Sequence, residues 1–321
     1  MEDLKQEITF EAKSGNVDRV IALINRGVSI NTKGSSGNSL LQYALMGLDR
    51  YRGVNLEIVR TLINRGIDVN LKNEYGKDAL YDAGLCYIYK NGNKAFDLIV
   101  DAGADLNSRY DEGKTLLIEL TERGIVNAVK TLIDKGADLN LQDNEGNTAL
   151  HKSLERGGFA NIYNNIAQML ISSGADLSIK NNEGKTALEN IYLNGKKDYM
   201  DLIMSLAVCK DFKNMDVCLN EYFRMINKYE MKWNISNNNL GKDENLDMVK
   251  QNIDVMDDLK DCLQNVKKAI KNRFASIDSE GIKEGVRTIN KYVDEVNNLN
   301  SRYMVNSMLL PKANIEKNLS K

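Results

Sequence analysis

The sequence of 321 residues contains few of the residues that mark enzymes. It holds one histidine, one proline and one tryptophan. Because histidine is the usual general base near neutral pH and a common zinc ligand, a single copy argues against most hydrolytic and zinc chemistry. The phosphate-binding G-x-x-x-x-G-K-[ST], the nucleophile elbow G-x-S-x-G and the zinc motif H-E-x-x-H are missing as well. We therefore predict a non-enzyme with no catalytic residue, no metal and no cofactor.

The chain also lacks long apolar runs, a strong net charge and closely paired cysteines. No uncharged apolar stretch approaches the ~18 residues that span a bilayer, and residues 1–10 lack the apolar core of a signal peptide. Lys and Arg total 43 against 45 Asp and Glu, so no basic field attracts phosphate backbones. These absences favour a cytoplasmic protein without a membrane span and argue against a nucleic-acid partner. Reduced, buried thiols are expected at Cys86, Cys209, Cys218 and Cys262.

What the sequence has instead is an internal repeat. Five tails of similar sequence occur at Gly27–Asn31, Gly66–Asn70, Gly103–Asn107, Gly136–Asn140 and Gly174–Ser178. Their glycines are 39, 37, 33 and 38 residues apart. A second motif follows each tail about ten residues later, and it starts at Gly37, Gly76, Gly113, Gly146 and Gly184. Two motifs that recur in phase predict one supersecondary unit that is stacked several times.

Each part of the unit has a physical role. Thr115, like Thr148 and Thr186, stands where a helix begins, and its hydroxyl can satisfy an unpaired amide of the first turn. Gly113 permits the tight turn before that helix. An apolar stripe on a second helix is formed by Val126, Val129, Leu132 and Ile133. Gly136 then ends that helix.

The second motif resembles the G-x-T-P-L-H signature of ankyrin repeats, and the resemblance covers about two thirds of the chain. It implies an all-α solenoid with short β-hairpin or turn tips. The signature proline is absent, since Leu40, Ala79, Leu116, Ala149 and Ala187 take its place. Only one repeat keeps the signature histidine, at His151. For this residue the resemblance implies a structural hydrogen-bonding role.

The phased motifs predict the domain layout. Residues 1–207 form the solenoid, with a capping repeat at 1–31 and full repeats at about 32–70, 71–107, 108–140, 141–178 and 179–207. Beyond it, apolar residues at three-or-four spacing predict a helix at 208–234, which either caps the stack or binds a partner. A linker at 235–245, a helical hairpin at 246–307 and a loose tail at 308–321 complete the layout.

The resemblance also implies where a partner binds, namely at the hairpin tips and the exposed side of the first helices, which line a concave groove. The matching positions are Glu74, Tyr75, Lys77, Asp111, Glu112, Lys114, Glu122, Arg123, Asn144, Glu145, Asn147, Glu155, Arg156, Asn182, Glu183 and Lys185. Among them, one carboxylate per repeat at Glu74, Glu112, Glu145 and Glu183 favours a partner with basic or amide-bearing side chains. The alternative is that Asn-Glu-Gly is good turn chemistry repeated by duplication.

Three repeats are longer than the family unit, and the extra residues fall near Gly47–Asn55, Cys86–Lys94 and Gly157–Asn165. Insertions in a solenoid mark one face, which often binds a ligand. The candidate insert face carries Tyr51, Tyr87, Tyr89 and Tyr163. Alternatively, the inserts only lengthen helices.

Three functional classes follow from these patterns. Protein–protein recognition through the concave face is the leading hypothesis. The frequent use of Asn, Lys and Ile suggests an AT-rich genome, so a host-directed effector that acts in the host cytosol, or a scaffold, is a narrower version. A second class is an enzyme with a carboxylate site in the C-terminal helical region, at Asp257, Asp258 and Asp261. The third is a structural protein that self-assembles into a homo-oligomer through the hairpin at 246–305.

Overall fold

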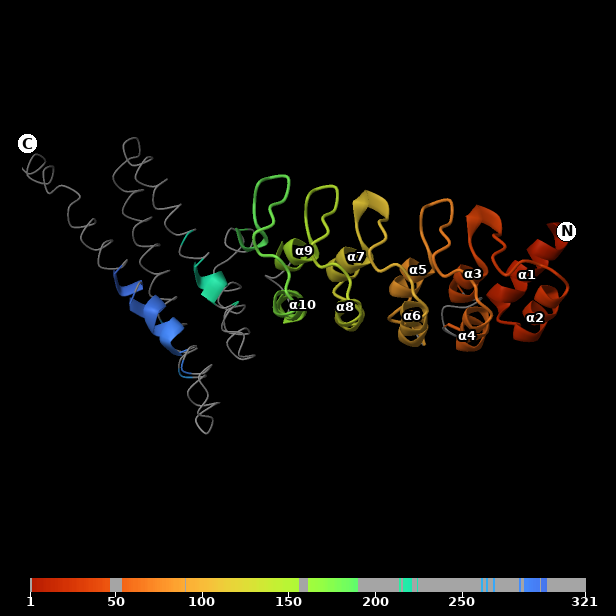
Figure 1. The fold of residues 1–321 in the computed structure, drawn as a ribbon, viewed down its shortest axis with the longest axis horizontal. Coiled ribbons are helices and arrows are strands. Elements are labelled where there is room, and N and C mark those ends of the chain that lie inside the picture. The colour runs from red at the N-terminus through yellow and green to blue at the C-terminus, as the bar shows by residue number, and fades with distance from the viewer. Residues whose placement is uncertain are drawn as a thin grey trace, which may run out of the picture. The chain divides into compact units, whose positions relative to one another are not determined.

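Figure 1 shows the computed structural model of the chain, which divides into two compact units, Met1–Ala187 and Leu188–Lys321. The structure describes residues 2–46, 54–89, 91–155 and 161–189. In the second unit it describes isolated positions and short stretches, chiefly 216–220, 286–294 and 296–298. The predictions at Tyr51, Arg156, 235–245 and 308–321 lie outside the described residues, as does most of the hairpin predicted at 246–307.

The first unit is built from paired helices. The pairs are α1 (Glu2–Ser14) with α2 (Val17–Asn25), α3 (Leu40–Met46) with α4 (Leu56–Asn64), α5 (Ala79–Leu85) with α6 (Gly92–Asp101), α7 (Leu116–Glu122) with α8 (Val126–Asp134), and α9 (Ala149–Glu155) with α10 (Asn161–Ser172). In Figure 1 the first helices α3, α5, α7 and α9 form one layer, the second helices form another, and a loop rises from each junction on one side. This is the predicted all-α solenoid.

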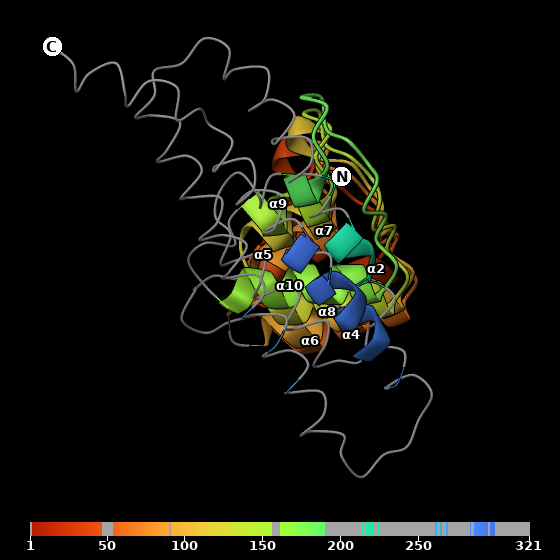
Figure 2. The same cartoon turned by 90° about the vertical axis from the view of Figure 1, so that its left-hand side faces the viewer.

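The projecting loops are tight turns with little strand character. Among the described residues, pairing across the loops is limited to the bridges Lys33 with Ser39, Arg109 with Thr115, and Lys180 with Thr186. The tips of two loops are short 3₁₀ turns, η1 (Ser35–Gly37) and η2 (Asp111–Gly113). Seen along the stack, the loops overlie one another (Figure 2). Successive tips therefore lie along one edge of the first unit.

The local signals in the sequence explain where the helices begin, end and pack. The Thr115 hydroxyl accepts a bond from the Ile118 amide and caps α7, as predicted. Val129 and Leu132 are fully buried on α8, which ends before Gly136 with φ +85°. A residue with positive φ ends a helix, and glycine adopts this conformation without steric cost.

The recurring tails form a ladder of asparagines along the stack. Oδ1 of Asn107 accepts a bond of 2.9 Å from the amide of Asp138, one repeat further on. Equivalent bonds of 2.8–2.9 Å join Asn31 to Asp68, Asn70 to Asp105, and Asn140 to Asp176. Each aspartate in turn accepts from the amide two residues later, so it fixes the turn that presents its own amide. The motif recurs because each copy bonds to the next.

The described part of the second unit has a buried core of its own. Ile289, Val293 and Val296 are buried. The fully buried Tyr292 donates a bond of 2.8 Å to Asp216 Oδ1 and thereby joins two segments that lie 76 residues apart.

Cys218 is buried and Cys86 partly exposed, and neither forms a disulfide. No helix in the described part of the chain has the length and apolar character to span a membrane.

Candidate functional site

The residue directly before each turn glycine occupies a recurring position at the tip of its loop. Counted from Gly37, Gly76, Gly113, Gly146 and Gly184, this outer tip row consists of Ser36, Tyr75, Glu112, Glu145 and Glu183. Glu74, which we predicted together with these carboxylates, stands one position earlier, two residues before Gly76. The amide of Glu74 donates to Ser36 O of the preceding tip, as the amides of Asn144 and Asn182 do in later repeats. The row therefore holds three carboxylates and one exposed tyrosine.

Backbone hydrogen bonds join several neighbouring tips. The Asn144 amide donates to Glu112 O at 2.9 Å, and the Asn182 amide donates to Glu145 O at 3.0 Å. The Asn182 side chain adds a bond of 2.9 Å to Asn144 O. Asn144 and Asn182, which we predicted as partner contacts, thus also hold the tips together. Because these bonds fix adjacent loops to each other, Glu112, Glu145 and Glu183 are displayed on one rigid edge.

The tip turns have two conformations, and one upstream residue accounts for the difference. In three loops, a side-chain Oδ1 accepts bonds from the amides two and four residues later; these residues are Asn73, Asp143 and Asn181. Gly34 and Tyr110 hold the equivalent place in the other two loops and cannot make such bonds. In those loops the tip residue is left-handed, with φ 59° at Ser36 and φ 57° at Glu112.

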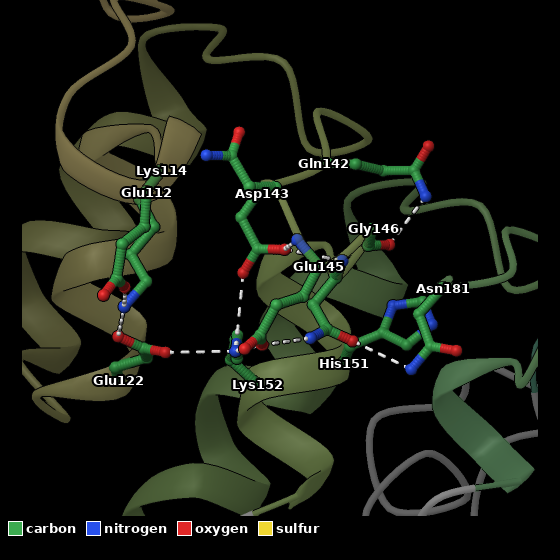
Figure 3. A network of polar contacts seen from close by, with 12 residues as sticks. Glu112, Lys114, Glu122, Gln142, Asp143, Glu145, Gly146, His151, Lys152 and Asn181 are labelled. Carbon is green, nitrogen blue, oxygen red and sulfur yellow. Dashed lines mark hydrogen bonds and ion pairs between the residues drawn. The ribbon is translucent and has the colours of Figure 1, made fainter. Parts of the chain in front are cut away.

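Behind the tips, a lysine of the third full repeat joins its loop to its first helix. Lys114 Nζ lies 2.8 Å from Glu112 Oε2 at the tip and 2.9 Å from Glu122 Oε2 at the end of α7 (Figure 3). Burial disfavours the charged form of Lys114, but its bonds to both glutamates outweigh this cost and raise its pKa above the usual value. The ammonium group therefore stays charged and fixes the position of the Glu112 side chain.

A second lysine, on α9, extends this network into the next repeat. Lys152 Nζ lies 2.9 Å from Glu145 Oε2 and 3.4 Å from both Glu122 Oε1 and Asp143 Oδ2 (Figure 3). Burial opposes its charge, but the Glu145 bond and the neighbouring carboxylates raise the pKa of Lys152 overall. The bond from Lys152 is also the main cause of a lowered pKa at Glu145. The network thus contains four carboxylates and two lysines, and keeps an excess of negative charge.

Other predicted residues pair more locally. Lys77 reaches Asp111 of the next loop at 3.0 Å, and Lys185 reaches Glu183 of its own loop at 2.7 Å. Arg123 pairs with Glu119 one helical turn away on α7, outside the network. Glu155 is exposed at the end of α9. Asn147 donates to Glu145 at 3.1 Å and accepts from Asn181 at 3.0 Å, so it supports the tip from within.

The tyrosines of the inserts divide into packed and exposed residues. The Tyr87 ring contacts the edge of Phe96, with ring centres 5.5 Å apart. Tyr163 donates a bond of 3.2 Å to Glu122 O. Tyr89 is exposed, and so is its neighbour Ile88. At Tyr87 and Tyr163 the inserts therefore pack against the repeats.

The signature histidine has a structural place, as the resemblance implied. His151 Nδ1 lies 2.9 Å from the Thr148 hydroxyl, and Nε2 lies 3.2 Å from Lys185 O in the next loop. Burial lowers the pKa of His151. In the first full repeat Gln42 has the same position and makes equivalent contacts, to the Ser39 amide at 3.1 Å and to Lys77 O at 3.2 Å. Glutamine thus substitutes for histidine at a junction between repeats.

The sequence prediction missed Lys152, Asp143 and Tyr110. Lys152 lies on a helix turn that is itself buried, and its charge partners lie in two different repeats. Counting positions from each turn glycine does not find this network, because the equivalent of Lys152 in the preceding repeat is Glu119, which pairs with Arg123. In the part of the chain that the structure describes, no three His, Cys, Asp or Glu side chains gather in a way that could hold a metal ion. What the described residues offer a partner is a surface of carboxylate acceptors held in place by lysines.

Paired helices in two layers, with a loop projecting from every junction, define a helical-repeat solenoid. A family model for three copies of the ankyrin repeat matches residues 85–181, and a model for a single ankyrin repeat matches residues 36–74. Residues 36–74 and 85–181 are therefore ankyrin repeats. Neither model reaches the second unit.

Solved structures show the same fold. An ankyrin repeat domain from Acinetobacter baumannii AYE is 26% identical, with a TM-score of 0.53, and the match covers 61% of this chain and 95% of that one. The ankyrin repeat protein EF0377 is also 26% identical, with a TM-score of 0.51, over 60% of this chain and 92% of its own. A comparison with curated proteins finds no significant match. Ankyrin repeats are interaction modules, so a protein partner is implied.

Proposed function

We propose that the protein recognises a partner protein through the outer tips of its repeats and the first helices behind them. Repeat solenoids commonly bind along such extended surfaces, because the same position recurs at each unit. Here the recurring position is the outer tip row, and in repeats three to five it presents a carboxylate. The proposed surface consists of Tyr75, Glu112, Glu145 and Glu183, with Lys77, Asp111, Lys114, Glu122 and Lys185 beside them.

One observation carries this proposal: every tip carboxylate is more exposed than the lysine that holds it. The side chain of Glu112 is 74% exposed and that of Lys114 is 17% exposed. The values are 74% for Glu145 and 10% for Lys152, and 68% for Glu183 and 39% for Lys185. Each lysine thus restrains its carboxylate from the less exposed side. The remaining lone pairs of the carboxylate face solvent. Restraint before binding reduces the side-chain entropy that a complex would lose.

The exposed groups indicate the chemistry of the partner. Carboxylates accept hydrogen bonds, and arginine, lysine and amide side chains supply the matching donors. The exposed Tyr75, which precedes the three carboxylates in the row, adds an amphipathic contact of the kind that is enriched in protein interfaces. We therefore propose a partner segment that carries basic residues. A scaffold, or an effector that acts on host proteins, would both work through such a surface.

The proposal is tested by capturing partners from a lysate of the source or host cell with the full-length chain. The variant Glu112→Lys/Glu145→Lys reverses two tip carboxylates. A matched control, Asp101→Lys/Asp134→Lys, makes the same change in charge on the second helices, where both aspartates also pair with lysines. A partner that is lost with the tip variant and kept with the control supports the proposal. Equal capture by all three proteins, or equal loss with both variants, contradicts it.

A second candidate function places recognition in the second unit. Tyr292 bonds to Asp216 and joins two segments that each contribute buried residues, among them Leu219 and Ile289, so the unit has a core that could serve a separate role. Removal of residues 246–321 distinguishes the two candidates in the same assay. A partner that binds the tip variant normally and is lost only on truncation assigns recognition to the second unit.

A further inference from the structure

The loops of the second and third full repeats meet differently from all other neighbouring loops. At the other junctions, the tip amide bonds to the preceding tip, through Glu74 to Ser36, Asn144 to Glu112, and Asn182 to Glu145. The equivalent pair between repeats two and three is Asp111 and Tyr75. Among the described residues, no such bond joins these two. The continuous edge of the tips is therefore interrupted at this single junction.

A second set of bonds is interrupted at the same place. In three loops, the long side chain four residues before the turn glycine bonds to a carbonyl of the next loop. Lys33 Nζ bonds to Lys72 O at 2.7 Å, Arg109 to Gln142 O at 2.6 Å, and Gln142 Nε2 to Lys180 O at 3.0 Å. Lys72 holds the equivalent position in repeat two. Its ammonium instead lies 5.7 Å from the centre of the Tyr110 ring.

Tyr110 supplies the contacts that replace both sets of bonds. Its hydroxyl donates to the carboxylate of Asp78 at 2.9 Å, and its ring lies 4.7 Å from that of Tyr81. Lys77 adds an ion pair with the exposed side chain of Asp111. These are all side-chain contacts. Because side-chain contacts involve more rotatable bonds than backbone bonds, they allow a wider range of loop separations.

The opposite side of the same junction keeps the regular bonds. Asn70 Oδ1 accepts from the Asp105 amide at 2.8 Å, as at every other step of the asparagine ladder. Lys135 of α8 pairs with Asp101 at the end of α6. The helices α5 and α7 pack against each other less extensively than α3 with α5 or α7 with α9, and α6 and α8 pack less extensively than α4 with α6 or α8 with α10. The junction is thus weakly packed between its helices, keeps the regular bonds along the asparagine ladder, and lacks them along the loop tips.

We propose that this junction is a hinge in the solenoid and that Tyr110 is its latch. The hinge separates repeats one and two from repeats three to five, and the asparagine ladder serves as its axis. When the Tyr110–Asp78 bonds break, the two sets of loops move apart. Tyr75 then moves relative to Glu112 and its successors, so the curvature of the surface becomes adjustable. The proposed motion occurs in the free protein and does not require a partner.

The test measures distances between spin labels in the full-length chain with its native cysteines replaced by alanine. One pair of labels, at Glu74 and Asn144, spans the hinge. The control pair, at Asp111 and Asn182, spans an equal number of repeats at the equivalent loop position but lies wholly on one side. We expect the distance distribution across the hinge to be at least twice as wide as the control. Equal widths would overturn the proposal.

Two variants test the latch itself. Tyr110→Phe removes the bonds to Asp78, and we expect it to widen the hinge distribution further while the control pair is unchanged. Tyr43→Phe is the matched variant, because it removes a hydroxyl that bonds to Ser35 O within one repeat, and it leaves both distributions as they were. A wider distance distribution in Tyr43→Phe, or an unchanged hinge distribution in Tyr110→Phe, would contradict the role of Tyr110 as a latch.

A third variant is designed to strengthen the hinge junction. The test therefore does not depend only on variants that weaken the fold. The side chains of Asn73 and Asn38 bond at 2.8 Å, and those of Asn181 and Asn147 bond at 3.0 Å across their junctions. The double change Lys77→Asn/Tyr110→Asn installs the same pair of residues at the hinge. We expect the hinge distribution to narrow to the width of the control. A distribution that stays wide would show that the missing bonds do not set the motion.

Discussion

Asn107 accepts, through its side-chain oxygen, a hydrogen bond of 2.9 Å from the backbone amide of Asp138 in the next repeat. This bond connects a sequence motif directly to the stacking of the solenoid. The motif is visible because its residue type recurs, and it recurs because each copy must satisfy an amide of its neighbour. The stability of the stack is therefore shared among its junctions, as in other repeat proteins.

Replacement of Asn107 by alanine should destabilise the first unit. The Asp138 amide loses its acceptor, although water can reach it, so we expect a loss of about 1 kcal/mol in the free energy of unfolding. Asn127→Ala is the control, since Asn127 is exposed on α8. Chemical denaturation measures both. An equal effect of the two substitutions would show that the ladder contributes nothing specific.

His151→Gln should be tolerated, because Gln42 makes equivalent contacts at the same position of another repeat. We expect its free energy of unfolding to stay within about 1 kcal/mol of that of the natural chain. His151→Leu leaves the buried Thr148 amide without its acceptor and should cost roughly 1–3 kcal/mol. Thermal or chemical denaturation distinguishes the two. If glutamine proved as harmful as leucine, the assigned structural role would be wrong.

The repeats could be predicted from sequence because their signals are local. Turn glycines, capping threonines and apolar stripes each act within a few residues, and their phase reveals the unit. Contacts between repeats are harder to predict, since Lys152 meets Glu122 across 30 residues of chain. The different position of Glu74 within its loop becomes visible only when each glutamate is counted from its turn glycine. No signal in the sequence marks Tyr110, because its role depends on bonds that are present at the other junctions and missing at its own.

Asp82 gives the first unit a dependence on pH. Burial on α5 raises the pKa of Asp82 to about 6, an effect that the bond from Gln42 only partly offsets. Between pH 4 and 6 the folded chain binds a proton that the unfolded chain has released, so this residue lowers stability as pH rises through that range. We expect Asp82→Asn, which still accepts from Gln42, to stabilise the protein at pH 7 by roughly 2–3 kcal/mol. The gain should vanish near pH 4, and a gain that is constant with pH would refute this origin.

Lys152 holds the carboxylates of two repeats, and its removal should be costly. Lys152→Met keeps the length of the side chain but leaves Glu122, Asp143 and Glu145 without their shared cation. We expect a loss of roughly 2–3 kcal/mol in the free energy of unfolding, because breaking a buried ion pair leaves uncompensated charge. Lys130→Met serves as the control, since it breaks an exposed pair with Asp134 that is worth at most about 0.5 kcal/mol. Similar losses from both substitutions would contradict the burial argument.

The central claim is that the outer tips of the repeats form the binding surface. Hydrogen–deuterium exchange of the full-length chain, with and without its captured partner, tests this claim most directly. We predict slower exchange on binding in the loops at 108–115, 141–148 and 179–186, with little change in the second helices α8 and α10. Protection confined to residues 188–321, with unchanged exchange in the three loops, would contradict the account and assign recognition to the second unit.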